Sequence, residues 1–385
     1  MTEREARIAF NMIPTVGSVT VQRLIRETQG DVAAAYERYP EKRDWEGRVP
    51  AWEREIARAE KMGVTILTEV DAAYPPQLRT IASPPLALYC VGDPAALAKP
   101  GVALVGTRQG TEYGRDVAER LAYGLARRGW SVVSGLARGI DACAHKGALT
   151  GEGVTVGVLG GALDKFYPTE NRALARQMIA QGGCVVSEFP FGRAPDAKTF
   201  PQRNRIVSGL ARGVVAVECP THSGTLITCL RAVEQGRAVM AVPGRIDWRT
   251  SEGCHHLIRE GARMVCSVDD IVEELTPLSA HAKKKTSQPA VAVQPEPGVP
   301  PPHPALQPVR PLKETRPTPA PESTITVDEA AVMRAVTAEG VTLDRIVVAT
   351  GFPISQVNVL VVGLRLKGRL RLLPGNRVCL PVIGQ

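Results

Sequence analysis

The chain has 385 residues, of which 44% are hydrophobic and 22% are charged, and its formal net charge is +8. This composition is typical of a globular protein with more than one domain, and the positive balance weakly favours a polyanionic partner. No stretch is apolar for long enough to span a membrane, and the N-terminal sequence lacks the apolar run of a signal peptide. The eight cysteines include no C-x-x-C pair. We therefore expect a cytoplasmic protein with buried thiols and no membrane partner.

The first 85 residues are expected to form a small helical domain. Apolar residues recur at helical spacing over residues 3–62, with breaks at Gly30, Pro40 and Pro50. Residues 13–25 (IPTVGSVTVQRLI) form a turn before a helix, loosely like a helix-hairpin-helix element that binds DNA phosphates through backbone amides. A turn that serves only packing explains the same residues, and we favour that interpretation.

Residues 86–276 are expected to form the main α/β domain. Short apolar runs alternate there with helical stretches, and runs of this length indicate parallel strands buried on both faces of a doubly wound sheet. The predicted strands cover residues 86–92, 102–106, 131–135, 155–161, 184–189, 214–219 and 238–244.

The C-terminal part divides into a linker and a third domain. Residues 277–325 hold 13 of the 31 prolines and a KKK run, which predicts an extended, disordered linker. Residues 326–385 follow the pattern of a winged helix. The predicted helices cover residues 328–339, 343–350 and 354–367, and a hairpin pairs residues 370–373 with 377–380.

The loops that follow the predicted strands are rich in Gly, Ser, Thr and Arg. Ligands of open α/β sheets bind beyond the carboxyl ends of the strands, and small residues let backbone N–H groups approach an anion. The first such loop lacks the G-x-G-x-x-G spacing of NAD-binding folds, and no P-loop motif occurs, so we expect phosphate binding without a nucleotide cofactor. The loops cover residues 106–110, 134–139, 160–164, 219–225 and 243–245.

The stretch FPQRNRIVSGLARG, residues 200–213, places two arginines in the first turns of a predicted helix. Helix starts favour negative side chains, so Arg203 and Arg205 suggest an anionic ligand there. With Arg108 from another loop, three guanidinium groups are expected to converge on one anion or phosphate chain. The alternative is ion pairing of Arg203 and Arg205 with nearby carboxylates, namely Glu188, Glu218 or Asp247.

Patterns for catalysis or metal binding are poor. The histidines have no nucleophile motif near them, and the run Cys254-His255-His256 lacks a second ligand pair at suitable spacing. We therefore expect neither a catalytic residue nor a metal, and no enzyme activity. Five aromatic residues near the candidate loops could stack on bases or simply pack in the core: Phe166, Tyr167, Phe189, Phe191 and Phe200.

Together these motifs resemble the DNA-processing protein A (DprA/Smf) family. The matching segments run from about Tyr89 to Ala262 and are VALVGTR, SGLARGIDACAHKGAL, GGALDKFYPTEN, SEFPFG, FPQRNRIVSGLARGVVAVEC, SGTLIT, GRAVMAVPG and GCHHLIREGA. The N-terminal segment, similar to SAM or helix-hairpin-helix domains, and the C-terminal winged helix are also similar to flanking domains of that family.

The resemblance implies an extended Rossmann-like domain that forms a homodimer and binds single-stranded DNA. It also implies a recombination mediator that protects incoming strands and loads the recombinase RecA during natural transformation, in competent cells that take up DNA. The residues that it implies for DNA binding, together with the loop residues inferred above, are Gly106, Thr107, Arg108, Ser134, Gly135, Gly161, Phe200, Arg203, Asn204, Arg205, Ser223, Gly224 and Thr225.

Some residues depart from the family pattern. Thr107 and Thr225 replace the usual serines but keep a hydroxyl for a phosphate, and His256 stands where asparagine is common. The third helix of the winged domain is mostly apolar, so we expect partner binding or weak backbone contact there instead of base recognition. Its basic strip consists of Arg365, Lys367, Arg369 and Arg371.

Two other functions compete with this interpretation. The SGTLIT loop is also similar to nucleotide phosphoribohydrolases of the lysine-decarboxylase-like group, but those have a catalytic glutamate directly after the glycine-rich loop, whereas Glu234 stands far along the helix here. The winged helix alone would suggest a transcription factor that reads duplex sites. The apolar third helix and the mild charge argue against that class.

Overall fold

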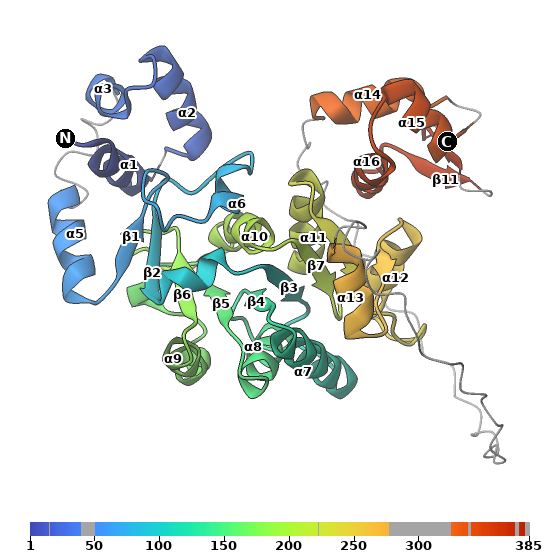
Figure 1. The fold of residues 1–385 in the computed structure, drawn as a ribbon, viewed down its shortest axis with the longest axis horizontal. Coiled ribbons are helices and arrows are strands. Elements are labelled where there is room, and N and C mark those ends of the chain that lie inside the picture. The colour runs from blue at the N-terminus through green and yellow to red at the C-terminus, as the bar shows by residue number, and fades with distance from the viewer. Residues whose placement is uncertain are drawn as a thin grey trace, which may run out of the picture.

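The computed structural model describes residues 1–14, 16–39, 51–221, 223–276, 325–337, 340–373 and 377–381. The predicted linker, apart from residue 325, and His222 lie outside these residues. Figure 1 shows a central α/β domain with helices of the N-terminal segment on one side and the C-terminal domain on the other. No helix among the described residues combines the length and apolar character needed to cross a membrane.

A nine-stranded sheet forms the centre of the described structure, in the order β1-β2-β6-β5-β4-β3-β7-β8-β9. All seven predicted strands are present, and β3 to β9 pair in parallel, which confirms a doubly wound Rossmann-like sheet. The first two strands pair antiparallel at one edge. The bounds are β1 Thr65–Leu67, β2 Leu88–Gly92, β3 Gly101–Val105, β4 Ser131–Ser134, β5 Thr155–Val158, β6 Cys184–Ser187, β7 Gly213–Ala216, β8 Ala238–Ala241 and β9 Arg263–Met264.

Helices cover both faces of the sheet, which is why the strands read as continuous apolar runs. Alternate residues of β3 belong to different cores: Val102 and Leu104 to one, Ala103 and Val105 to the other. The first core also takes in α7 (Glu112–Arg127), α8 (Ile140–Thr150) and α13 (Val268–Leu275). The opposite core takes in α10 (Thr199–Leu210), α11 (Gly224–Glu234) and α12 (Glu252–Arg259), and α9 (Arg172–Ala180) packs in a third cluster.

The N-terminal segment is helical, as predicted, but its last part enters the sheet. The aromatic ring of Phe10 packs edge-on against Tyr36, with ring centroids 5.1 Å apart, in the centre of this domain. β1 pairs with β2 although it lies before residue 86; a strand of three residues is too short to show a periodicity in the sequence. The helices are α1 Glu3–Met12, α2 Ser18–Glu27, α3 Val32–Arg38, α5 Trp52–Lys61 and α6 Pro76–Arg79.

The C-terminal residues form the predicted winged helix. Its three helices and its hairpin are present, the first helix is shorter than predicted, and an unpredicted strand, β10, completes a three-stranded sheet in the order β10-β12-β11. The predicted turn at residues 374–376 lies outside the described residues. The bounds are α14 Val327–Ala335, β10 Val341–Thr342, α15 Leu343–Thr350, α16 Ile354–Leu366, β11 Arg371–Leu373 and β12 Arg377–Cys379.

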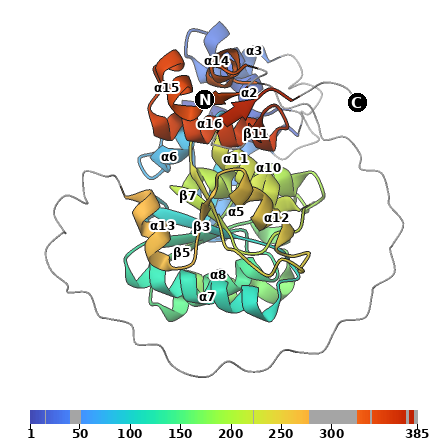
Figure 2. The same cartoon turned by 90° about the vertical axis from the view of Figure 1, so that its right-hand side faces the viewer.

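The third helix of the winged domain, α16, packs against α11 of the α/β domain (Figures 1 and 2). A Cβ atom on Gly363 would lie 2.5 Å from the Val233 side chain, so only glycine allows this approach. Arg365 contacts the Glu260 carboxylate at 2.7 Å from the end of α12, and Lys367 lies 3.8 Å from Glu234. Within the chain, the third helix of the winged domain therefore packs on the α/β domain.

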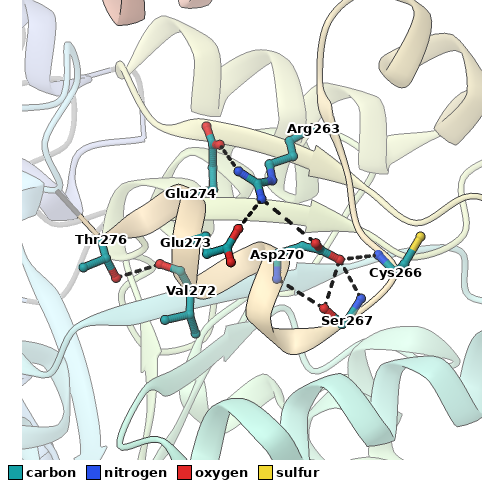
Figure 3. A network of polar contacts seen from close by, with 8 residues as sticks. All are labelled: Arg263, Cys266, Ser267, Asp270, Val272, Glu273, Glu274 and Thr276. Carbon is teal, nitrogen blue, oxygen red and sulfur yellow. Dashed lines mark hydrogen bonds and ion pairs between the residues drawn. The ribbon is translucent and has the colours of Figure 1, made fainter. Parts of the chain in front are cut away.

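A polar network holds α13, the last helix of the α/β domain, against β9 (Figure 3). Ser267 and Asp270 form a capping box at the start of α13, in which the Asp270 carboxylate also accepts from the Cys266 amide at 2.9 Å. Arg263 of β9 contacts Glu273 at 2.8 Å and Glu274 at 3.3 Å. These contacts fix α13 against the edge of the sheet.

Candidate nucleic-acid interface

One pocket lies where the order of the sheet reverses. β3 stands between β4, which leads to β5 and β6, and β7, which leads to β8 and β9. Beyond the carboxyl ends of β3, β4 and β7 lies a pocket of about 500 Å³. This is the usual ligand site of doubly wound sheets. Ten of the predicted site residues line it: Gly106, Thr107, Arg108, Gly135, Phe200, Arg203, Asn204, Ser223, Gly224 and Thr225.

Glycines and one buried carboxylate hold the loop after β3 in place. A Cβ atom on Gly106 would lie 2.6 Å from the Ile140 side chain, so the loops after β3 and β4 approach each other only without a side chain there. Glu218, 1% exposed, accepts from the Thr111 amide at 2.8 Å and from the Thr111 hydroxyl at 2.6 Å. The Thr107 amide donates to the Glu218 carbonyl at 2.8 Å, which ties the loop after β3 to the end of β7.

Arg203 forms the floor of the pocket. Its side chain is buried, and its Nη1 donates to the carbonyls of Gly135, at 2.5 Å, and of Val158. The buried Asp141 carboxylate accepts from the Gly135 amide at 3.1 Å. Burial lowers the pKa of Arg203 to about 10, against the opposing effect of Asp141, so the guanidinium stays charged at neutral pH. Arg203 therefore holds the loop after β4 to the end of β5 as well as adding positive charge.

Arg108, Phe200, Tyr167 and Arg138 form a row of cations and rings at one side of the pocket, where Tyr167 lines a small adjoining hollow. The Arg108 guanidinium lies 4.8 Å from the centroid of the Phe200 ring, and Arg138 lies 5.7 Å from that of Tyr167. The two rings are 6.3 Å apart and tilted. Arg138 pairs with Glu170, whereas exposed Arg108 has no ion pair within the described part of the chain. The row presents flat apolar faces next to an uncompensated positive charge.

The N-terminus of α11 supplies a further anion-binding element. Ser223 is the N-cap, yet its hydroxyl makes no capping hydrogen bond and lies 3.0 Å from the Cys219 sulfur instead. The first turn of α11 holds no acidic residue. Asn204 donates to the Gly224 carbonyl at 3.2 Å and so fixes α11 relative to α10. The amides of this turn and the helix dipole favour a negative group at Ser223 to Thr225.

Three predicted site residues do not line the pocket. Ser134 is fully buried, and its hydroxyl donates to the Leu104 carbonyl at 2.6 Å. Gly161 packs against Pro195, 2.8 Å from where a Cβ atom would stand. Arg205 lies on the other side of α10 and pairs with Glu188. Residues two apart on a helix are rotated by about 200° around its axis, so their side chains point to nearly opposite sides. The expected convergence of three guanidinium groups therefore does not occur. Arg203 and Arg108 share the pocket, and Arg205 has the predicted alternative, an ion pair.

Sequence reasoning missed Arg138 and Asp141, which also line the pocket. Both belong to the quoted segment SGLARGIDACAHKGAL, so the signal was available. Arg138 was the only cation in the loop after β4, and an acid at the start of a helix that follows a glycine-rich loop is expected to bind backbone amides. Only the structure shows that Asp141 turns inward beneath Gly135.

Two of the histidines and one of the candidate aromatic residues have structural roles. His145 is fully buried, with Nδ1 2.7 Å from the Thr155 hydroxyl, and His255 contacts the Gly244 carbonyl at 2.9 Å. Within the described ranges, no three His, Cys, Asp or Glu side chains gather as metal ligands would. Phe191 packs on Tyr89 with ring centroids 5.4 Å apart, in the core. Glu234 ends α11 at the opposite end from the pocket, which counts against the phosphoribohydrolase alternative.

Comparisons with known proteins identify two domains of one family in the chain. The family model for DNA recombination-mediator protein A matches residues 65–276, and the DprA winged helix domain matches residues 316–376. Protein Smf of Escherichia coli is 46% identical over 202 residues, 52% of this chain and 54% of the relative, so the match spans about half of each.

Two solved structures are also similar. The structure of DNA processing protein A (DprA) from Streptococcus pneumoniae aligns with a TM-score of 0.60 and 34% identity, and covers 71% of this chain and 98% of that one. DNA processing protein A from Helicobacter pylori, described for its single-stranded DNA binding mode, aligns with a TM-score of 0.50 and 31% identity over 55% of this chain and 95% of that one. With its doubly wound sheet, its switch-point pocket and its winged helix, the chain belongs to the DNA recombination-mediator protein A (DprA/Smf) family.

Proposed function

We propose that this protein binds single-stranded DNA in the switch-point pocket and acts as a recombination mediator. The observation that carries the proposal is the row of Arg108, Phe200, Tyr167 and Arg138 beside the uncapped N-terminus of α11. Phosphates would bind Arg108 and the α11 amides, while unstacked bases would lie on the rings. A duplex hides its base faces, so these rings favour a single strand.

Each residue has a defined part in this mechanism. Arg108 neutralises a phosphate, and Phe200 offers a stacking surface worth about 1 to 3 kcal/mol per base. Gly106, Gly135 and Gly224 let the strand approach the backbone. Arg203 holds the segments of Gly135 and Val158 in place and adds positive potential to the pocket. Its Nη1 already donates to these two carbonyls and does not bind the ligand.

The wider role rests on family membership. The Helicobacter pylori relative is described as a binder of single-stranded DNA. By the same relation we propose that this protein protects incoming strands, loads RecA during natural transformation and acts as a homodimer in the cytoplasm, without enzymatic activity. Two pockets on one strand would raise the overall affinity by an intramolecular second binding step.

Fluorescence anisotropy of a labelled single strand and its duplex over a salt series tests the pocket. We expect preference for the single strand and a log–log salt slope of about −0.7 per phosphate contact. Arg108→Gln should weaken binding about tenfold and reduce the slope by one contact, because a charge-assisted bond is lost. Arg176→Gln, which removes an exposed cation from α9 outside the pocket, is the matched control. Equal affinities for the two variants would contradict the proposal.

A further inference from the structure

A second cavity, of about 560 Å³, lies between the N-terminal helices and the α/β domain. The turn between α1 and α2 forms one wall, and the segment after β6 with the start of α10 forms the other. Polar contacts join the walls: Asn11 donates to the Glu188 carbonyl at 3.0 Å, and the hydroxyls of Ser18 and Ser83 lie 2.5 Å apart. The cavity is therefore a defined part of the fold.

The first turns of α10 separate this cavity from the DNA pocket. Arg203 and Asn204 line the pocket, whereas their neighbours Gln202 and Arg205 line the second cavity. In Figure 1, α10 runs between α11 and the N-terminal part of the chain. Both openings also lie at the carboxyl edge of the sheet, because the second cavity follows the end of β6. The start of α10 therefore contributes residues to both linings, with the pocket on one side of the helix and the cavity on the other.

The second cavity has an excess of positive donors. Among its described lining residues, three are cationic, Arg193, Lys198 and Arg205, and one is anionic, Glu188. Arg193 pairs at 2.5 Å with Asp196, which does not line the cavity, so Lys198 is the lining cation without an ion pair in the described structure. Although Arg205 pairs with Glu188, its buried Nη1 has no hydrogen-bond partner. A buried donor of this kind is costly unless a ligand or solvent satisfies it.

The opposite wall adds the N-terminus of α2. Its N-cap is Gly17, which has no side chain to bond the first amides, and no acidic residue stands in the first turn. The unsatisfied amides and the helix dipole present positive charge to the cavity. The start of α2 and the cationic side chains of the α/β domain thus offer hydrogen-bond donors to the same cavity. Phosphate oxygens can accept from both.

We propose that the DNA strand held in the pocket continues over the start of α10 into this cavity, where its phosphates bind Lys198, Arg193, Arg205 and the first amides of α2. The inference rests on the proposed function of the pocket. It makes the turn between α1 and α2 a phosphate-binding element, in contrast to the packing role favoured from the sequence. It also predicts that strands longer than the pocket gain affinity through the N-terminal domain.

The test compares Gly17→Asp with Gly17→Asn in the full-length chain. Gly17 has extended dihedrals, and a Cβ atom there meets nothing within 4 Å, so both residues are accommodated. Both are good N-caps, and only aspartate adds negative charge to the cavity. Anisotropy is measured with strands of about 4 and about 16 nucleotides, the range of site sizes in single-strand-binding folds.

We expect Gly17→Asp to bind the longer strand about fivefold more weakly at low salt than Gly17→Asn does, and the shorter strand equally well. The double variant Arg193→Gln, Lys198→Gln should lower the salt slope for the longer strand by about 0.7 per lost contact, unlike a control with Lys146→Gln and Arg176→Gln. Equal binding of the longer strand by both Gly17 variants overturns the proposal. If Arg108→Gln still weakens the shorter strand in that case, the pocket stands and the cavity alone fails; if the wild type binds neither strand, both proposals fail.

Discussion

The two basic regions of the molecule show opposite arrangements of the same residue types. In the pocket, exposed Arg108 lies over an aromatic ring with no carboxylate partner in the described structure. At the end of α16, Arg365 is 6% exposed and pairs with Glu260 of the α/β domain. Lys367 is 2% exposed, lies 3.8 Å from Glu234 of the α/β domain and contacts Glu329 of its own domain at 2.8 Å. A cation without a partner is available to a ligand, whereas a paired and buried cation holds domains together. Positive charge in the sequence does not distinguish the two.

Arg203 combines both arrangements, and its removal should have the largest effect. Arg203→Met leaves the buried Asp141 without its cation and the Gly135 and Val158 carbonyls without a donor. We expect the free energy of unfolding to fall by about 3 to 5 kcal/mol, measured by urea denaturation. Arg108→Gln should change it by less than about 0.5 kcal/mol, because Arg108 is exposed.

The double variant Arg203→Met, Asp141→Asn serves as the control. Removal of the buried carboxylate charge should restore part of the lost stability. If Arg203→Met were as stable as the wild type, Arg203 would resemble Arg108 and would be a direct ligand for DNA instead of a structural brace.

The sequence predicted the parts of the fold that follow from strong periodicity. The seven buried strands between residues 86 and 244 read as apolar runs because helices cover both faces, and all were found. β1, β9 and β10 have two or three residues, too few for a pattern. The opposite directions of Arg203 and Arg205 follow from helix geometry and could have been deduced. The docking of α16 on α11 could not, because it depends on which apolar surfaces meet.

Mild acid should destabilise the α/β domain through His145. Burial, with a smaller effect of Arg203, lowers the pKa of His145 to about 3 from its ordinary value of 6.5. The folded protein therefore keeps His145 neutral, so its contribution is full above pH 6.5 and is lost as the pH falls toward 3. Between pH 6.5 and 5 the loss is about 2 kcal/mol.

Urea denaturation at each pH measures this dependence. His145→Asn removes the titrating group, so the slope of the unfolding free energy against pH should fall by the contribution of about one bound proton. This holds whatever the overall stability of the variant. An unchanged slope in the variant would mean that other groups cause the acid sensitivity and that His145 is not kept neutral by burial.

The smallest expected effect concerns the contact between Arg365 and Glu260, and it tests the other half of the comparison. Both side chains are mostly buried at the interface between α16 and α12, so their coupling should exceed that of a surface pair. In a double-mutant cycle of Arg365→Met and Glu260→Gln, we expect a coupling of about 1 kcal/mol, read from the protection of the winged helix against limited proteolysis. Affinity for a single strand should stay unchanged in all three variants, because neither residue lines the pocket. A coupling near zero would mean that the apolar contact around Gly363 holds the domains together alone. A fall in affinity in the variants that lack Arg365 would mean that this cation, like Arg108, contacts the DNA.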